Sequence, residues 1–176
     1  MEPWRRLGAS RVASCRVFDV NGVTMAVPGA PAPREYFVIE APDWINVVPM
    51  TAAGEIVLVR QFRIGVDAVT LEIPGGMCDP GESPIVAARR ELLEETGYDS
   101  GDIVDLGWVH PNPALQGNRC HTFLARDAFP AAEPRPDADE AIEVVTVPGG
   151  AIAGMIRDGA ITHALVVAAF YRLGLV

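Results

Sequence analysis

The chain of 176 residues is predicted to be an α/β protein, a three-layer α/β/α sandwich around a mixed β-sheet. Three observations predict this fold class. Short segments rich in Val and Ile recur along the chain, segments with helical periodicity lie between and after them, and the breaks fall at Gly, Pro, Asn and Asp. Strands mixed with helices bury both faces of a sheet, which produces three layers.

An antiparallel extension of strands is expected at the N-terminus. Asn21-Gly22 lies between two apolar segments and is typical of a type I′ turn, so we expect a hairpin with strands at 12–19 and 23–27. A proline-broken loop and a further strand at 36–40 follow.

Strands and helices are mixed in the rest of the chain. Short loops rich in Gly, Pro or charged residues separate them, and Gly159 divides the last two helices. The expected elements are strands at 44–51, 56–62, 69–73, 103–109, 120–125 and 142–147, and helices at 84–96, 148–158 and 162–173.

The helix at 84–96 carries the densest chemistry of the chain. Ser83 is a good N-cap, Pro84 at the first helical position loses an N–H that has no partner there, and Gly97 suits the left-handed residue that ends a helix. Glu91 and Glu95 lie about 40° apart around the helix, and Glu94 lies about 60° to the other side of Glu91.

Three carboxylates on one stripe repel each other unless a cation lies among them. Hard cations such as Mg²⁺ and Mn²⁺ bind carboxylate oxygens and commonly bridge them to substrate phosphates. Glu91, Glu94 and Glu95 are therefore candidate metal ligands. An Arg-Glu…Glu-Glu helix on its own is also compatible with a solvated surface, so the flanking residues decide between the two interpretations.

The composition limits the partners and the compartment. Hydrophobic residues make up 49% of the chain, yet no apolar run approaches the ~18–20 residues that cross a bilayer. The N-terminus lacks an apolar signal-peptide core, and three widely spaced cysteines indicate reduced thiols, so a cytoplasmic protein is expected. A formal net charge of −9 disfavours nucleic acid, and a polyanionic substrate would need a bound cation.

Residues 76–98 resemble the Nudix box, Gly-x5-Glu-x7-Arg-Glu-U-x-Glu-Glu-x-Gly-U, in which U is a bulky apolar residue. The matching residues are Gly76, Glu82, Arg90, Glu91, Leu92, Glu94, Glu95, Gly97 and Tyr98. The Gly76 loop with Glu82 at the required spacing favours the metal-binding interpretation over a plain surface helix. The resemblance implies a Nudix fold and Mg²⁺, with Mn²⁺ as a substitute. Arg90 is expected to pair with the glutamates and orient them.

Two segments before the box resemble the ADP-ribose pyrophosphatase branch of the family. They are Gln61-Phe62-Arg63 and Glu72-Ile73-Pro74-Gly75-Gly76. The resemblance implies that the Gly75 carbonyl binds a metal and that Arg63 meets a substrate phosphate, for which a planar guanidinium is suited. Arg60 is a second candidate for the phosphate. Each arginine is also compatible with a solvated charge at the end of a strand.

The segment after the box departs from that branch. Pro113 stands where the branch has a proline, but Asn112, Ala114 and Asn118 replace its Ser, Gly and Glu. We expect Pro113 and Asn118 to contact the substrate, and the Asn118 amide to form a hydrogen bond with a sugar hydroxyl. Strict preference for ADP-ribose is therefore not expected.

Three further residues have two interpretations each. In the family a glutamate from a late acidic loop can activate the attacking water, and Glu140 fits that position best, although a plain surface loop is equally compatible. Trp44 is a candidate for stacking on the base, with burial at an interface as the alternative. Cys78 within the box loop is interpreted as a filler residue, with a catalytic nucleophile as the alternative.

The sequence therefore predicts one Nudix hydrolase domain over residues 1–176, with a β extension at 1–40 that dimerises and a core at 41–176. We expect a Mg²⁺-dependent pyrophosphohydrolase that cleaves a nucleoside diphosphate sugar such as ADP-ribose into a nucleoside monophosphate and a sugar phosphate. A Nudix hydrolase of a damaged nucleoside triphosphate and a non-catalytic nucleotide-sugar sensor remain the alternatives. A sensor would be expected to lose a box carboxylate, and none is lost.

Overall fold

The computed structural model describes residues 1–135 and 141–176. The chain forms two compact units, one made of Met1–Pro42 with His110–Arg119 and one made of Asp43–Val109 with Cys120–Val176. None of the helices in the described residues is long and apolar enough to cross a membrane. The division into a 1–40 extension and a 41–176 core stays a prediction.

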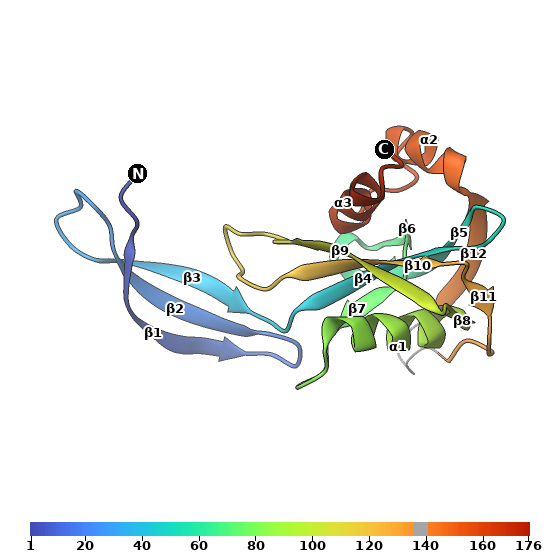
Figure 1. Cartoon of the computed structure of the whole chain (residues 1–176). Coiled ribbons are helices and arrows are strands. Elements are labelled where there is room, and N and C mark those ends of the chain that lie inside the picture. Colours follow the sequence, from blue (N-terminus) through green and yellow to red (C-terminus); the bar gives the residue numbers. More distant parts are fainter. Residues whose placement is uncertain (136–140) are drawn as a thin grey trace. The chain divides into compact units, whose positions relative to one another are not determined.

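The first unit is built on a three-stranded antiparallel sheet (Figure 1). Its strands are β1 (Arg5–Ser14), β2 (Asp19–Ala26) and β3 (Arg34–Glu40), with β2 in the middle. The segment 110–119 joins this unit where the Ile39 backbone N–H donates to the Leu115 carbonyl at 2.7 Å. The extension of antiparallel strands is thus present.

The predicted turn at Asn21-Gly22 is wrong. Both residues lie inside β2, where Asn21 is opposite Arg11 on one side and Val38 on the other. A Cβ at Gly22 would lie 2.8 Å from Glu35 Oε1, the end of an exposed side chain that can move away. The chain reverses earlier, where the Cys15 N–H donates to the Phe18 carbonyl at 2.9 Å.

The second unit is built on a mixed seven-stranded sheet. Its strand order is β12-β5-β4-β10-β9, with β6 paired to β5 and β7 paired to β4. The β4–β10 pair is parallel and the other pairs are antiparallel. The strands are β4 (Trp44–Met50), β5 (Glu55–Arg63), β6 (Ala68–Glu72), β7 (Gly75–Met77), β9 (Asp102–Val109), β10 (Cys120–Arg126) and β12 (Ile142–Pro148). The mixed sheet is confirmed.

Helices cover both faces of this sheet (Figure 1). On one face, α1 (Pro84–Thr96) packs Ala88 and Leu92 against Ile45 and Val47 of β4. On the other face lies a second apolar core, to which α2 (Ile152–Arg157) and α3 (Ala164–Leu173) contribute Ile152, Val166 and Phe170. The predicted three-layer α/β/α sandwich is therefore confirmed.

Short elements complete the second unit. They are the 3-10 turns η1 (Ile64–Val66) and η2 (Gly149–Ala151), and the two-stranded sheet of β8 (Tyr98–Asp99) and β11 (Phe129–Pro130). The positions of the predicted strands and helices after residue 40 agree with the structure to within about two residues, apart from a later start of the α2 helix.

The large sheet divides beside the box. β4 and β5 are hydrogen-bonded at Met50 and Ile56, and from there each strand takes a different neighbour. β7 pairs with β4, so that Gly75 lies opposite Asn46, while β6 pairs with β5. As a result, Gly75 and Gly76 lie on β7, which contacts α1.

Candidate active site

Local sequence signals place α1 as predicted. Pro84 is the first residue of the helix, and Ser83 before it is extended, with φ −77° and ψ 148°, although the Ser83 side chain makes no capping hydrogen bond. Gly97 ends it in the left-handed region at φ 71°, where its N–H donates to the Leu93 carbonyl at 2.9 Å. A Cβ at Gly97 would overlap the Ala132 carbonyl, so glycine is required there for space as well as for conformation.

Two of the candidate ligands lie against the glycines of β7. Glu95 is 2% exposed, and its Oε2 accepts a hydrogen bond from the Gly75 N–H at 3.2 Å. The Glu91 carboxylate fills the space beside Gly76, because a Cβ at Gly76 would overlap it. The absence of a side chain at Gly76 makes room for Glu91, whereas Glu95 reaches β7 through the backbone N–H of Gly75.

Arg90 lies at the centre of the acidic cluster. Its Nε and Nη2 donate to the two oxygens of Glu82 at 3.0 and 2.9 Å. Its Nη1 donates to Glu91 at 2.9 Å and to Glu94 at 3.1 Å. The hydrogen bond with Glu82 raises the pKa of Arg90, and the same bond holds the pKa of Glu82 below its usual value. The guanidinium therefore offsets the repulsion among these carboxylates.

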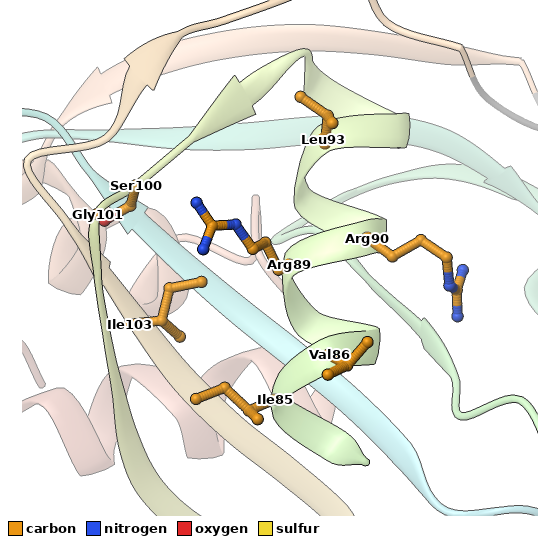
Figure 2. Close-up of a pocket in the computed structure, with 8 residues that line it drawn as sticks. All are labelled: Ile85, Val86, Arg89, Arg90, Leu93, Ser100, Gly101 and Ile103. Carbon is orange, nitrogen blue, oxygen red and sulfur yellow. The ribbon is translucent and has the colours of Figure 1, made fainter. Parts of the chain in front are cut away.

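The side of α1 on which a residue lies decides its partners. Figure 2 shows Arg89 and Arg90 leaving α1 on opposite sides. Arg89 points into a groove between α1 and the start of β9 and pairs with Asp99 at 3.0 Å. Both arginines contribute to the lining of this groove, but their charged ends have different partners. Arg89 pairs with Asp99, and Arg90 pairs with glutamates that the sequence predicts as ligands.

The oxygen atoms gathered here suit a hard divalent cation. The donor set is three carboxylates, from Glu91, Glu94 and Glu95, together with the backbone of Gly75, and Mg²⁺ and Mn²⁺ favour such oxygen ligands. In residues 1–135 and 141–176, no group of three or more His, Cys, Asp or Glu side chains is already arranged around one metal position. The guanidinium of Arg90 and the Gly75 N–H hold the carboxylates instead.

Arg63 makes a bidentate ion pair with a buried carboxylate. Its Nε and Nη2 donate to the two oxygens of Glu72 at 2.9 and 2.8 Å, and the Thr70 hydroxyl donates to the same carboxylate at 2.6 Å. Burial raises the pKa of Glu72, but the hydrogen bonds from Arg63 and Thr70 outweigh it and hold this pKa below its usual value. Glu72 thereby fixes the Arg63 guanidinium at the end of β5.

The Glu72 pair predicts a specific dependence of stability on pH. Because the folded-state pKa of Glu72 is lowered, the stabilisation is present above the unfolded-state value of about 4.3 and is lost as the pH falls through the folded-state pKa. Glu72→Gln should therefore lower Tm at pH 7 and flatten the fall in Tm between about pH 5 and pH 2. Thermal melts across that range test this, with the exposed Glu55→Gln as control. An unchanged acid limb in Glu72→Gln would contradict the assignment.

The second arginine candidate has a different environment. Arg60 is exposed on the opposite face of β5 from Arg63, because side chains alternate along a strand. It forms an ion pair with Glu143 at 3.2 Å, and both side chains are largely solvent-exposed. A phosphate contact for Arg60 or Arg63 stays a prediction.

The candidates for contacts with base and sugar lie at several positions. Trp44 is the first residue of β4 and is half-buried. Asn118 is 7% exposed, and its amide donates to the Pro42 carbonyl at 3.0 Å and accepts from Gln116 at 2.9 Å. Pro113 is exposed in the turn before it. Asn118 and Pro113 belong to the first compact unit and Trp44 to the second, and their roles stay predictions.

The predicted catalytic Glu140 lies outside the described residues. The last described residue before it, Arg135, donates its backbone N–H to the Glu94 carbonyl at 2.7 Å. On the other side, Ile142 is opposite Gln61 in the sheet. The role of Glu140 stays a prediction.

Cys78 is not an activated thiol. Burial raises its pKa, and the nearby carboxylates of Asp43 and Glu82 raise it further. Burial likewise raises the pKa of Cys120 to about 12. Since the thiolate is the nucleophilic form, neither side chain is suited to attack a substrate at neutral pH.

The sequence interpretation missed several polar residues of this region. Glu72 lies in the Glu-Ile-Pro-Gly-Gly segment, and a single carboxylate in an apolar strand is the signal that indicates its buried ion pair. The Asp43 carboxylate lies 3.2 Å from His121 Nε2, and its backbone carbonyl accepts from the Cys78 N–H at 2.9 Å. No sequence spacing indicates that second pair, because its members are 78 residues apart.

The α/β/α sandwich carries Arg-Glu-Leu-Leu-Glu-Glu on α1 against the glycines of β7, which is the arrangement that the resemblance to the Nudix box implies. The chain belongs to the Nudix family, since the family model for the NUDIX domain matches residues 42–168. Nudix hydrolases use divalent metal ions. The predicted family and its enzymatic class are confirmed.

Relatives and a solved structure share most of the chain. It is 30% identical to the ADP-ribose pyrophosphatase of Bacillus subtilis (strain 168), over 81% of this chain and 77% of that one. It is 35% identical to the ADP-sugar pyrophosphatase of Mus musculus, over 76% and 66% of the two chains. A crystal structure of an ADP compounds hydrolase superposes with a TM-score of 0.86 at 25% identity, covering 98% of this chain and 93% of that one.

Proposed function

We propose that this enzyme hydrolyses the diphosphate of a nucleoside diphosphate sugar such as ADP-ribose, releasing a nucleoside monophosphate and a sugar phosphate. The proposal includes Mg²⁺ as the cation, with Mn²⁺ as a substitute. The observation that carries it is the placement of the Glu91 and Glu95 carboxylates on the backbone of Gly75-Gly76. The names of the relatives support the substrate class, because they include ADP-ribose, ADP-sugar and GDP-mannose pyrophosphatases.

Each residue of the site has a distinct part in the proposal. Glu91, Glu94, Glu95 and the Gly75 carbonyl would hold the cation, which when bound neutralises phosphate oxygens and lowers the pKa of a water ligand. Arg63 remains 43% exposed at its side chain while Glu72 holds it, so its guanidinium is oriented and still accessible to a phosphate oxygen. Arg60 is assigned the weaker role of attracting the anion. Glu140 is assigned the orientation of the attacking water.

The specificity of the site is predicted to be broad. Asn112, Ala114 and Asn118 replace the Ser, Gly and Glu of the ADP-ribose pattern, and loose contacts discriminate between substrates by only ~1–3 kcal/mol. We expect ADP-ribose, GDP-mannose and UDP-glucose to be hydrolysed with kcat/KM values within about two orders of magnitude. A substrate panel with Mg²⁺, read by chromatography, tests this. A nucleoside triphosphate turned over far faster than every nucleotide sugar would contradict it.

The bond that is cleaved is tested separately. In ¹⁸O-water the label should enter one phosphate of the cleaved diphosphate and should not reach the sugar carbon, because the proposed attack is on phosphorus. Mass spectrometry of both products locates the label. Label on the anomeric carbon would show glycosidic cleavage instead.

The proposal also includes a homodimer and a cytoplasmic location. β1 is exposed along all ten of its residues and lies at the edge of its sheet, where unpaired backbone groups favour pairing with another chain. Exposed Leu7 and Val12 add apolar surface, and Trp44 would stack on the base. The three free cysteines support a reducing compartment.

Light scattering at micromolar concentration should detect a dimer. Val12→Lys places a charge on the edge strand β1 and should therefore weaken the dimer. The control is Glu55→Lys, at an exposed position in the other compact unit. A wild-type monomer with full activity would refute the dimer.

A further inference from the structure

The two ends of the Arg90 guanidinium have different partners. Nε and Nη2 form a bidentate pair with Glu82, and Nη2 also donates to the Met77 carbonyl at 3.2 Å. Nη1 donates hydrogen bonds to Glu91 at 2.9 Å and to Glu94 at 3.1 Å. One end therefore binds a residue of the box loop, and the other end binds two of the residues proposed as metal ligands.

The loop end is the better fixed of the two. The Glu82 side chain is 12% exposed, and its Oε2 also accepts from the Asp79 N–H at 3.0 Å. The Glu82 N–H in turn donates to the Asp79 carbonyl at 2.9 Å. Both oxygens of Glu82 and its backbone are thus engaged, so this end of Arg90 is tied to a closed loop and has two parallel bonds.

The Nη1 end is more weakly held. It contacts one oxygen each of Glu91 and Glu94, and the Glu94 side chain is 46% exposed. A single nitrogen shared by two carboxylates offsets their mutual repulsion, as a divalent cation would. A cation with metal–oxygen distances of about 2.0–2.1 Å draws carboxylates closer than a guanidinium at hydrogen-bond distance does, and two adjacent positive groups repel.

We propose that Arg90 is the internal counter-ion of the glutamate cluster: its Nη1 end holds Glu91 and Glu94 in the metal-free protein and is displaced from them when a divalent cation binds. The Nε and Nη2 end stays on Glu82 and keeps the guanidinium in place. This inference rests on the proposed metal site, and it makes Arg90 a positioning residue that also limits the affinity for the cation. Glu82 is accordingly an anchor for Arg90 and not a ligand.

The test compares Arg90→Met with Arg89→Met. Methionine keeps most of the aliphatic length and removes the charge, and Arg89 is the matched control because it lies on the opposite side of the same helix and pairs with Asp99 (Figure 2). Tm is measured with EDTA and with saturating Mg²⁺, and the Mg²⁺ Kd is measured by titration calorimetry. Neither readout depends on turnover.

Arg90→Met should have a lower Tm in EDTA, because Glu91 and Glu94 are left with uncompensated repulsion. Its Mg²⁺-induced rise in Tm should exceed that of wild type, with a Mg²⁺ Kd at least ~3-fold lower, since the cation no longer displaces or faces a guanidinium. Arg89→Met should show the same Mg²⁺-induced rise as wild type. A rise in Arg90→Met equal to or smaller than that of wild type would overturn the inference.

A second variant covers the case in which Arg90→Met does not fold in EDTA. Arg90→Gln removes the positive charge and keeps a side-chain amide that can donate a hydrogen bond to Glu82. Its Mg²⁺ Kd should lie below that of wild type, and a Kd equal to or above it would overturn the inference. If wild type itself shows neither Mg²⁺ binding nor a rise in Tm, the proposed metal site fails. If wild type binds and the Arg90 variants do not bind more tightly, only the counter-ion role fails.

Discussion

Replacing Glu91 or Glu95 by glutamine is expected to lower turnover by at least ~10²-fold, the scale of losing one strong electrostatic stabiliser. The change preserves the shape of the side chain and removes one negative charge from the proposed cation site. Glutamine at position 95 still presents an oxygen to the Gly75 N–H, which Glu95 binds at 3.2 Å, so the fold should survive. Steady-state kinetics at saturating Mg²⁺, with circular dichroism as a check on folding, measures the effect.

The control for these variants is Glu55→Gln, which changes an exposed carboxylate at the first residue of β5 and should leave turnover unchanged. Glu94→Gln should have a smaller effect than the other two, because Glu94 is the most exposed of the three glutamates and shares Arg90 with Glu91. Near wild-type turnover in Glu91→Gln or Glu95→Gln would show that the metal assignment is wrong.

Gly75→Ala is expected to cause a large loss of stability. A Cβ at Gly75 would overlap the Ile45 carbonyl and lie 2.7 Å from Asn46 Oδ1. The Asn46 side chain can move, but Ile45 is 1% exposed in the buried strand β4, so its backbone cannot withdraw cheaply. We expect a loss of about 2–3 kcal/mol, which lowers Tm by roughly 5–10 °C in a domain of this size.

Gly154→Ala is the matched control with the opposite sign. Gly154 lies within α2, has no positive φ, and has open space where a Cβ would be added. Alanine there should raise stability by roughly 0.5–1 kcal/mol, because glycine is entropically costly inside a helix. Differential scanning calorimetry of both variants tests the pair. If Gly75→Ala melts at the wild-type temperature, the close approach of β7 to β4 is not a constraint on folding.

Much of the fold could be predicted because its signals are local. The α1 helix begins at Pro84 and ends before the left-handed Gly97, as predicted, and the strands β4, β5, β6, β9, β10 and β12 follow their apolar segments. The short strands β7, β8 and β11 were not predicted. The candidate ligands on α1 could also be predicted, because helix geometry alone places Glu91 and Glu95 on one face. Local chemistry and spacing are sufficient for such features.

The sequence was misleading where a local signal competed with long-range pairing. Asn21-Gly22 is typical of a turn, but both residues lie in β2, where the Asn21 amide donates to Glu40 at 2.6 Å. The pairing of β2 on both edges satisfies its backbone groups along the whole strand, and this outweighs the intrinsic turn preference of two residues. Tertiary context decided that segment.

The sequence by itself determined the family, the helix that carries the candidate ligands and the residue types at the candidate site. Only the tertiary structure decided how those charges are partnered. The resemblance to the family implied that Arg90 pairs with the glutamates, and the structure shows this pairing. The Arg63–Glu72 pair and the way in which Arg90 divides its two ends between Glu82 and the other glutamates do not follow from spacing. The reason is physical: a helix fixes where its own side chains point, whereas an ion pair between elements depends on which strands are neighbours and on how much water is excluded between them.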